Sequence, residues 1–287
     1  MARPETKLVP LPATNFVPER DVAKKPILET RNLGIDFGGL AAVDGLDLAV
    51  SPTEIAGLIG PNGAGKTTVF NLLTAVYKPS RGTILFDGRD TAGMNSVQLN
   101  KAGIARTFQN IRLFDSLSVL DNVKLGLHNS FRYGMFTGIL RLPGYWRKER
   151  QANERAAELL SIFSMEGLAD HRAGSLPYGA QRRLEIIRAL ATEPKLLLLD
   201  EPAAGMNPSE TAELMENIVK VRDTFQIAVL LIEHEMSLVM GICEGICVLN
   251  FGKTIAKGTP SQIQNNPQVV EAYLGRRKQD GGDAQSN

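Results

Sequence analysis

Nine consecutive residues have the types and spacing that bind a phosphate group: Gly60, Pro61, Asn62, Gly63, Ala64, Gly65, Lys66, Thr67 and Thr68. They match the pattern G-x-x-x-x-G-K-[ST]. The glycines let the backbone turn tightly and bring its N–H groups close to an anion. Lys66 adds a positive charge for the terminal phosphates, and the Thr67 hydroxyl is placed for Mg²⁺. This loop therefore predicts a nucleotide-binding site.

The segments on either side of the loop support this interpretation. Ile55–Ile59 is an apolar run typical of a buried strand, and Val69–Leu73 resembles the start of a helix. Such a helix directs its unsatisfied N–H groups and the positive end of its dipole at the anion. An ordinary glycine-rich turn is the alternative, but Lys66 and Thr67 favour a nucleotide site.

Two adjacent acids, Asp200 and Glu201, end the apolar run that starts at Lys195. An acid at this place supports Mg²⁺ in P-loop ATPases. A neighbouring carboxylate can serve as general base for the attacking water. A plain surface pair would not explain why four leucines stop at two acids followed by Pro202. We therefore predict a metal-binding role for Asp200 and a catalytic role for Glu201.

Two further polar side chains lie at the ends of strand-like segments. Gln109 ends the segment that begins at Ile104, and its amide could reach both a metal ion and water. His234 follows the apolar run Ile227–Ile232 and could relay a hydrogen bond near the γ-phosphate. Each residue alone is more often structural. However, ligand sites of parallel sheets lie at the carboxyl ends of strands, which favours a functional role.

The order of the segments predicts an α/β fold, a P-loop NTPase with a mostly parallel core sheet. Strands are expected at 27–33, 46–50 and 82–88, with a turn at 36–39, and they form an antiparallel portion around the P-loop. Helices are expected from Ser118, over 148–165 and over 179–191. The core then continues with strands at 195–200 and 227–232, a helix at 208–224, two strands within 245–258 and a helical end at 260–274.

We expect a flexible leader over residues 1–26, one domain over 27–275 and a polar tail over 276–287. Within the domain we expect a β subdomain with the P-loop at 27–103, a helical insertion subdomain at 110–193 and the rest of the catalytic core at 194–275.

The composition sets further bounds on function. The net charge of +1 gives no global electrostatic case for binding nucleic acid. No apolar run reaches the roughly 18 residues that a membrane helix needs, and the charged, Pro-rich start is not a signal sequence. We therefore expect a cytosolic protein whose membrane role comes through partners. Cys243 and Cys247 stand four apart, as on one face of a helix, and we expect small core side chains rather than a zinc site.

Taken together, these motifs resemble the ATPase subunit of ABC transporters over residues 27–275. Residues 60–68 correspond to the Walker A loop, 195–201 to the Walker B strand, Gln109 to the Q-loop, 204–207 to the D-loop and His234 to the switch histidine. Phe37 lies where the family places an aromatic ring against adenine. The signature corresponds to Leu176, Pro177, Tyr178, Gly179, Ala180 and Gln181.

The resemblance implies a RecA-like core and a dimer that holds two ATP molecules between its subunits. Each ATP would contact Walker A of one chain and the signature of the other. Glu201, His234 and Gln109 would be catalytic, while Thr67, Gln109 and Asp200 would hold Mg²⁺. The implied partners are a second ABC ATPase subunit, in a homo- or heterodimer, two membrane permease subunits and, indirectly, a solute-binding protein. Such an assembly lies at the cytoplasmic side of the inner membrane.

A finer resemblance is to the larger ATPase of branched-chain amino acid importers of the Liv type. It rests on five segments: 105–110, 181–185, 200–208, 232–236, and 257–260 together with 272–275. Relatives that carry urea or other amides remain an alternative. So does a soluble ABC protein acting on DNA or ribosomes, although those usually carry two ATPase units and this chain has one and no basic stripe. A GTPase is disfavoured because Gly103 replaces the carboxylate of an Asn-Lys-x-Asp motif.

Two departures from the family pattern predict altered behaviour. Pro177 stands in the serine position of the signature and Ala180 in its glutamine position, while Asn207 replaces the usual D-loop aspartate. Because Pro177 lacks both a hydroxyl and an N–H, we hypothesise that the ATP site completed by this signature is less active.

The aromatic and basic segment 131–150 has two open interpretations, a docking surface for membrane subunits or a hairpin that packs its rings inward.

Overall fold

The structure is a computed structural model that describes residues 25–127 and 143–274. Almost all of the expected leader, all of the expected tail and most of the aromatic segment before Trp146 lie outside the described residues, so those expectations stay predictions.

An antiparallel sheet in the order β2-β1-β4-β5 forms the N-terminal part. Its strands are β1 (Leu28–Phe37), β2 (Leu40–Val50), β4 (Arg81–Phe86) and β5 (Arg89–Asp90). The β1–β2 hairpin is longer than the sequence predicts, because only Gly38 and Gly39, with φ of 55° and 86°, form its turn. The predicted turn at 36–39 is therefore wrong at its start, and Phe37 is the last residue of β1.

The core sheet has the order β10-β9-β3-β8-β7-β6. Its strands are β3 (Ile55–Ile59), β6 (Ile104–Arg106), β7 (Leu196–Asp200), β8 (Ala228–Ile232), β9 (Gly245–Asn250) and β10 (Lys253–Gly258). All neighbouring strands run parallel except β9 and β10. Every residue of β3, β7 and β8 is buried, which explains their continuous apolar sequences. The predicted α/β fold is confirmed.

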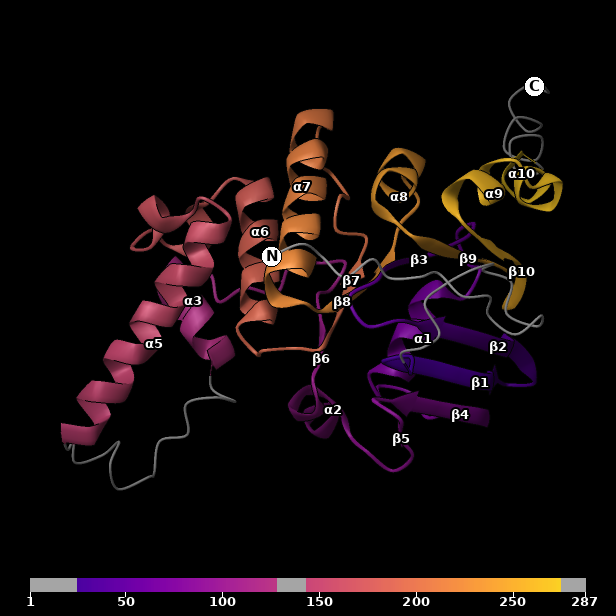
Figure 1. The fold of residues 1–287 in the computed structure, drawn as a ribbon, viewed down its shortest axis with the longest axis horizontal. Coiled ribbons are helices and arrows are strands. Elements are labelled where there is room, and N and C mark those ends of the chain that lie inside the picture. The colour runs from indigo at the N-terminus through magenta and orange to yellow at the C-terminus, as the bar shows by residue number, and fades with distance from the viewer. Residues whose placement is uncertain (1–24, 128–142, 275–287) are drawn as a thin grey trace, which may run out of the picture.

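The two faces of the core sheet belong to different hydrophobic clusters. Leu196 and Leu198 pack with the antiparallel sheet, α1 (Lys66–Leu73) and α2 (Ser96–Ala102). Leu197 and Leu199 point to the other face, which α6 (Tyr178–Leu190), α7 (Pro208–Phe225) and α8 (Met236–Ile242) cover (Figure 1). The helices α6 and α1 therefore lie on opposite faces of one sheet.

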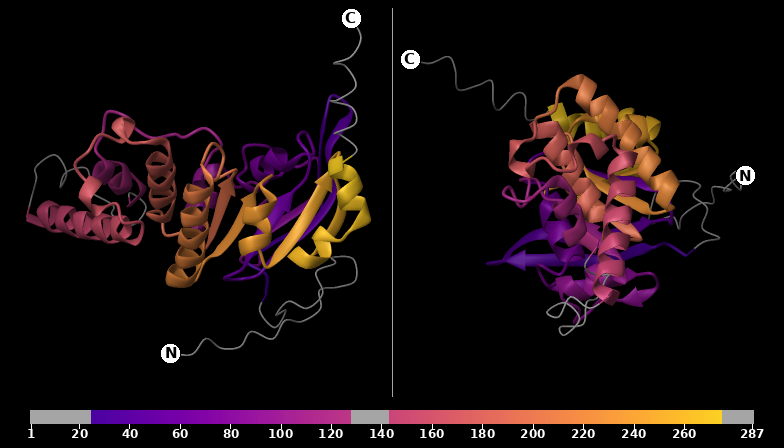
Figure 2. Two further views of the ribbon diagram at one scale, coloured as in Figure 1. Left: turned by 90° about the horizontal axis from the view of Figure 1, so that it is seen from above. Right: turned by 90° about the vertical axis from the view of Figure 1, so that its left-hand side faces the viewer.

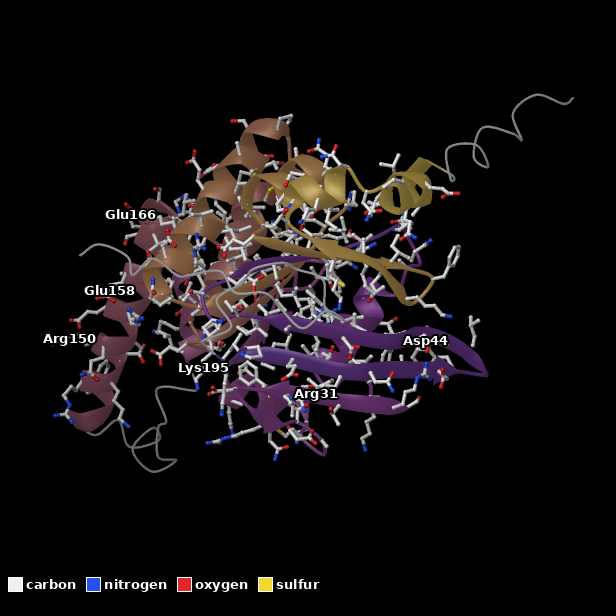
Figure 3. All side chains as sticks on the ribbon, turned by 45° about the vertical axis from the view of Figure 1, so that its right-hand side comes forward. Arg31, Asp44, Arg150, Glu158, Glu166 and Lys195 are labelled. Atoms are coloured by element: carbon white, nitrogen blue, oxygen red, sulfur yellow. The ribbon has the colours of Figure 1, made fainter. Side chains whose placement is uncertain are left out.

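A helical part stands at one end of the molecule, away from the antiparallel sheet (Figure 2). It contains α3 (Val119–Gly126), α5 (Pro143–Ile162) and two short 3₁₀ turns, Glu166–Leu168 and Ala173–Ser175. As predicted, Ser118 caps α3, accepting a hydrogen bond from the Asp121 N–H. Arg150 and Glu158 lie along α5, on the opposite side of the molecule from Asp44 (Figure 3).

Three details differ from the sequence-based expectations. The helix α2 was not predicted, although Asn95 and Gln98 form a capping box that signals it. The expected helical end is two helices, α9 (Pro260–Gln264) and α10 (Pro267–Leu274). Cys243 is the C-cap of α8 and Cys247 lies in β9, so they do not share a helix face, although both are buried as predicted.

Within the described ranges no helix is both long and apolar enough to cross a membrane.

Candidate functional site

Four neighbouring parallel strands bring the predicted site residues to one edge of the core sheet. The P-loop follows β3, Glu233 and His234 follow β8, and Asp200 and Glu201 lie at the end of β7. Gln109 follows β6 on the far side of β7. Because these strands are adjacent and parallel, residues that are far apart in sequence meet at their carboxyl ends.

The backbone of the P-loop requires its glycines for two different reasons. Gly60, Gly63 and Gly65 all have positive φ, at 152°, 78° and 102°. A Cβ at Gly60 would collide with the Leu249 carbonyl, and one at Gly65 would lie 2.6 Å from the Ala42 oxygen. A Cβ at Gly63 would meet no atom within 4 Å, so only the backbone conformation demands glycine there.

The start of α1 offers donors that fit a polyphosphate. Gly65 is its N-cap and provides no side-chain acceptor for the first N–H groups. Those groups and the helix dipole therefore remain available to an anion. The Lys66 ammonium is held inside the loop, where it donates to the carbonyl oxygens of Gly60 at 2.6 Å and Pro61 at 3.0 Å. Thr67, the second residue of α1, is exposed at the same end.

Asp200, the predicted metal ligand, is buried and paired with Arg106. Its side chain is 3% exposed, and its Oδ2 accepts a 2.8 Å hydrogen bond from Arg106. Among the described residues no group of three or more His, Cys, Asp or Glu could hold a metal ion. The Thr67 hydroxyl and the Asp200 carboxylate are hard oxygen donors, a set that suits Mg²⁺ when phosphate oxygens complete its coordination.

Glu201 has an unusual backbone conformation. Its φ is 47°, in the left-handed region that residues other than glycine rarely adopt. Its N–H donates to the Ile232 carbonyl at 2.9 Å, which ties the turn after β7 to β8. Such conformations persist where the surrounding structure over-determines them, and they cluster at functional sites.

The side chain of Glu201 is contacted from two other strand ends. Gln109 Nε2 donates a hydrogen bond of 2.9 Å to its Oε2. His234 Nδ1 lies 3.9 Å from its Oε1, and the imidazole is 55% exposed. The carboxylate itself is only 18% exposed. The structure therefore places the three predicted catalytic residues together, with Glu201 in the centre.

Glu233 was not predicted as part of the site. Its side chain is buried and accepts hydrogen bonds from the N–H groups of Ala203 at 2.9 Å and His234 at 3.1 Å. Burial raises the pKa of this carboxyl, against the opposing effect of these bonds. Glu233 thus links the turn after Glu201 to His234. The sequence does contain a signal for Glu233, because it is an acid directly after an apolar strand, the same pattern that identified Asp200.

The signature residues lie at the start of α6, with Pro177 as its N-cap and Gln181 in its first turn. Pro177 gives the helix no side-chain cap. Tyr178 is 45% exposed, whereas Leu176 and Ala180 are buried. Gly179 packs tightly, because a Cβ there would lie 2.9 Å from Glu210 Oε1. Since α1 packs on the opposite face of the sheet, these residues are separated from the P-loop of their own chain.

A buried ion pair on α6 holds the backbone of the Q-loop, and sequence reasoning missed it. Arg182 Nη1 donates to Glu185 Oε2 at 2.9 Å, and the two side chains are 0% and 2% exposed. The same guanidinium donates to the carbonyl oxygens of Phe108 at 2.6 Å and Gln109 at 2.8 Å. Glu185 Oε1 accepts from the N–H groups of Phe108 and Arg112, each at 3.4 Å. The signature helix therefore holds the loop that carries Gln109.

Two other predicted residues have clear structural roles. Phe37 is 46% exposed and makes a T-shaped contact with Tyr77, with ring centroids 5.3 Å apart. A face of the ring can therefore stack on a base while Tyr77 supports it.

Asn207 caps α7 by accepting from the N–H groups of Ser209 and Glu210. Asparagine and aspartate cap helices about equally well, so this departure from the family pattern preserves the cap.

Comparison with known proteins identifies the family. Residues 43–204, more than half of the chain, match the model of the ABC transporter family. The chain belongs to this family. As an ABC transporter ATPase it binds ATP and couples the hydrolysis of ATP to transport. Its C-terminal residues 253–278 match a second model, that of the branched-chain amino acid ATP-binding cassette transporter.

Individual members of the ABC family match most of this chain in sequence or in fold. The high-affinity branched-chain amino acid transport ATP-binding protein LivG of Escherichia coli (strain K12) is 48% identical over 88% of this chain and 98% of its own length. A crystal structure of the ADP conformation of an ABC transporter cassette has a TM-score of 0.77 and 30% identity, covering 88% of this chain and all of that one. A dimeric cassette bound to ADP and Pi has a TM-score of 0.68 and 25% identity, covering 81% and 98%.

Proposed function

We propose that this ABC ATPase energises the import of branched-chain amino acids, with ATP and Mg²⁺ bound at the strand ends described above. One observation carries the catalytic assignment: the side chains of Gln109 and His234 both lie next to that of Glu201, at the edge of the sheet that also carries the P-loop. The match of residues 253–278 and the similarity to LivG support the substrate class. Urea and other amides are the alternative solutes.

The residues have distinct roles in the proposed reaction. The P-loop N–H groups and Lys66 bind the phosphates, and Phe37 stacks on adenine. Thr67, Asp200 and Gln109 would hold Mg²⁺, which would neutralise negative charge on the phosphates when it is bound. Glu201 orients the attacking water and takes its proton, because its carboxylate is held in place but still partly exposed. Gln109 and His234 report the presence of the γ-phosphate through their contacts with Glu201.

The proposed working form is a dimer with a second ABC ATPase subunit, either another copy or a related chain. In such a dimer the signature residues of this chain complete the ATP site of its partner. The similarity to a cassette that is dimeric when bound to ADP and Pi supports a dimeric working form. Tyr178 at the start of α6 is exposed, so it is accessible to a nucleotide bound by a partner subunit.

Two membrane permease subunits, and indirectly a solute-binding protein, are the further proposed partners, which would hold the chain at the cytoplasmic side of the inner membrane. Exposed apolar side chains on and beside the helical part suit such docking: Phe114 is 54% exposed, Leu125 46% and Trp146 57%. The exposure of Trp146 favours docking over inward packing. Tyr133, a second aromatic residue of the segment 131–150, lies outside the described residues.

Reconstitution tests the whole proposal. The complex purified with its co-expressed neighbours should take up leucine into proteoliposomes when ATP is enclosed on the inner side together with the ATPase subunits. The Glu201→Gln complex should not. Uptake of urea without leucine would replace the substrate assignment.

A photoreactive amino acid at position 146 should crosslink to a permease subunit. If only intrachain products form, the docking surface is wrong.

A soluble ABC protein would behave differently in a simpler assay. The proposed subunit should sediment with membranes only when its permease partners are present. Binding to polynucleotide that weakens steeply with salt would instead identify a nucleic-acid factor.

A further inference from the structure

Arg106 connects the two halves of the candidate metal site. It is the last residue of β6, and its Nη2 donates to Asp200 Oδ2 on β7 at 2.8 Å. Its Nη1 donates to Asn71 Oδ1 at 2.7 Å and Thr74 Oγ1 at 3.3 Å, both on the α1 side. The helix α1 begins with Lys66 and Thr67. One guanidinium therefore joins the strand that ends at Asp200 to the helix that starts at the P-loop.

The Arg106 side chain is deeply buried and confined on several sides. It is 7% exposed, and Asp200 is 3% exposed. Its guanidinium lies 5.5 Å from the ring centroid of Phe70 and 5.1 Å from that of Phe108. Its Nε is buried and has no hydrogen-bond partner in the described structure. The planar guanidinium binds Asp200 with one terminal nitrogen and Asn71 with the other, which fixes its orientation. The single ammonium of a lysine could not reproduce this geometry.

Stability alone explains this arrangement poorly. A buried ion pair gains little over apolar side chains of similar size, because both charges lose their hydration. An unpartnered buried Nε adds a further cost. A geometric role accounts for the arrangement better. As long as Arg106 occupies one oxygen of Asp200, the carboxylate cannot turn without breaking the pair, and its distance from α1 stays constant.

We propose that Arg106 is a positioning residue for the metal site, which holds the Asp200 carboxylate in register with the Thr67 end of α1. This inference rests on the proposed assignment of Asp200 and Thr67 to Mg²⁺. Arg106 does not contact the ion in this proposal. It acts through Asp200, so that carboxylate and hydroxyl reach the same ion when nucleotide arrives.

Equilibrium binding of a fluorescent ATP analogue to the full-length chain tests the proposal. The analogue is titrated in excess EDTA and again in excess Mg²⁺. The dissociation constant in EDTA divided by the dissociation constant in Mg²⁺ measures the metal contribution. Arg106→Met and Arg106→Lys should each reduce this ratio by about tenfold, as expected for contacting residues that act together. The dissociation constant in EDTA should change less than about twofold, since the P-loop donors are untouched.

Matched variants separate positioning from general destabilisation. Leu159→Ala removes a fully buried side chain in α5, far from the metal site, and should lower the melting temperature without changing the ratio. Asn71→Leu keeps the pair with Asp200 but removes the shorter of the two hydrogen bonds from Arg106 to α1, so it should reduce the ratio in the same direction. Arg106→Met/Asp200→Asn should match Asp200→Asn alone in this ratio.

Several results would overturn the proposal, and they differ from a failure of the proposed function. If Arg106→Met raises the ratio while Arg106→Lys leaves it unchanged, Arg106 acts as a competing charge. An unchanged ratio in both variants, or an additive loss in the double variant, shows that Arg106 does not act through Asp200. If Asp200→Asn itself leaves the ratio unchanged, the metal assignment is wrong and this inference is wrong with it.

Discussion

Gln109 donates a hydrogen bond of 2.9 Å to Glu201, although 92 positions separate the two residues in the chain. The contact exists because β6 and β7 are parallel neighbours, with Arg106 opposite Leu198. The same Gln109 is held through its carbonyl oxygen by Arg182 of the signature helix. If the proposed roles hold, the residue that reports on one ATP is thus tied to the helix that serves the partner's ATP.

Replacing Glu201 by glutamine should stop hydrolysis without preventing ATP binding. The amide keeps an oxygen to accept from Gln109 but cannot take the proton of the attacking water. We expect steady-state hydrolysis to fall by about a hundredfold or more. Gel filtration with ATP should show an accumulated closed dimer. Steady turnover at the wild-type rate would refute the assignment.

Replacing Lys66 by alanine should weaken nucleotide binding itself. The ammonium already lies within the loop, 2.6 Å from the Gly60 oxygen, so little rearrangement is needed to reach phosphate. Loss of a charge-assisted hydrogen bond should weaken binding of the fluorescent ATP analogue by about ten- to a hundredfold. Lys101→Ala, at the exposed end of α2, is the matched control. Equal affinities in the two variants would contradict the role of Lys66.

The pair of Arg182 and Glu185 should matter more for hydrolysis than for net stability. Arg182→Met leaves a buried carboxylate unpaired and should cost about 3–5 kcal/mol in unfolding free energy, measured with urea. Arg182→Met/Glu185→Met should regain most of this stability. Hydrolysis should nevertheless stay low in the double variant, since the Q-loop has lost its backbone partners.

The Gln109→Ala variant provides the control for that prediction. If the buried pair acts through Gln109, adding Gln109→Ala to the double methionine variant should lower hydrolysis no further. Multiplicative losses would show that the pair affects the site by another route.

Replacing Pro177 by serine tests the hypothesis of a weakened signature. A serine at the N-cap of α6 can accept from the first helical N–H groups, so the variant should gain about 0.5–1 kcal/mol. In the assembled complex it should also hydrolyse ATP faster than wild type, because the hydroxyl can contact the partner's γ-phosphate. Pro177→Ala lacks the hydroxyl and should show neither gain. No increase in turnover would end the hypothesis.

Glu233 should make stability depend on pH. Burial raises the pKa of its carboxyl above that of the unfolded chain, so the native state holds the proton more tightly. Its stabilising contribution is complete below the unfolded pKa and is lost as the pH rises through the raised value. As the pH rises above the ordinary range of a glutamate carboxyl, wild type should therefore lose melting temperature relative to Glu233→Gln. Glu216→Gln, on the exposed face of α7, should show no such trend relative to wild type.

Local patterns were sufficient to predict several parts of the molecule. The buried strands β7 and β8 were predicted because parallel strands covered on both faces need continuous apolar runs. The loop at Gly60–Thr68 was recognisable because anion binding by backbone N–H groups requires glycines at fixed spacing. Errors arose where tertiary packing overrides the local pattern. Cys243 and Cys247 have helical spacing, but α8 ends at Cys243 and the chain continues as β9, which pairs with β3.

The sequence by itself determined which groups can bind phosphate, hold a metal ion and take a proton, because those properties belong to residue types and to short spacings. Only the tertiary structure decided which groups meet. Arg106 and Asp200 are 94 positions apart, and Arg182 reaches Phe108 across 74. No local pattern reports such contacts, since strand order and helix packing create them. The physical reason is burial: a charge removed from water needs a partner, and the fold determines which partner lies within reach.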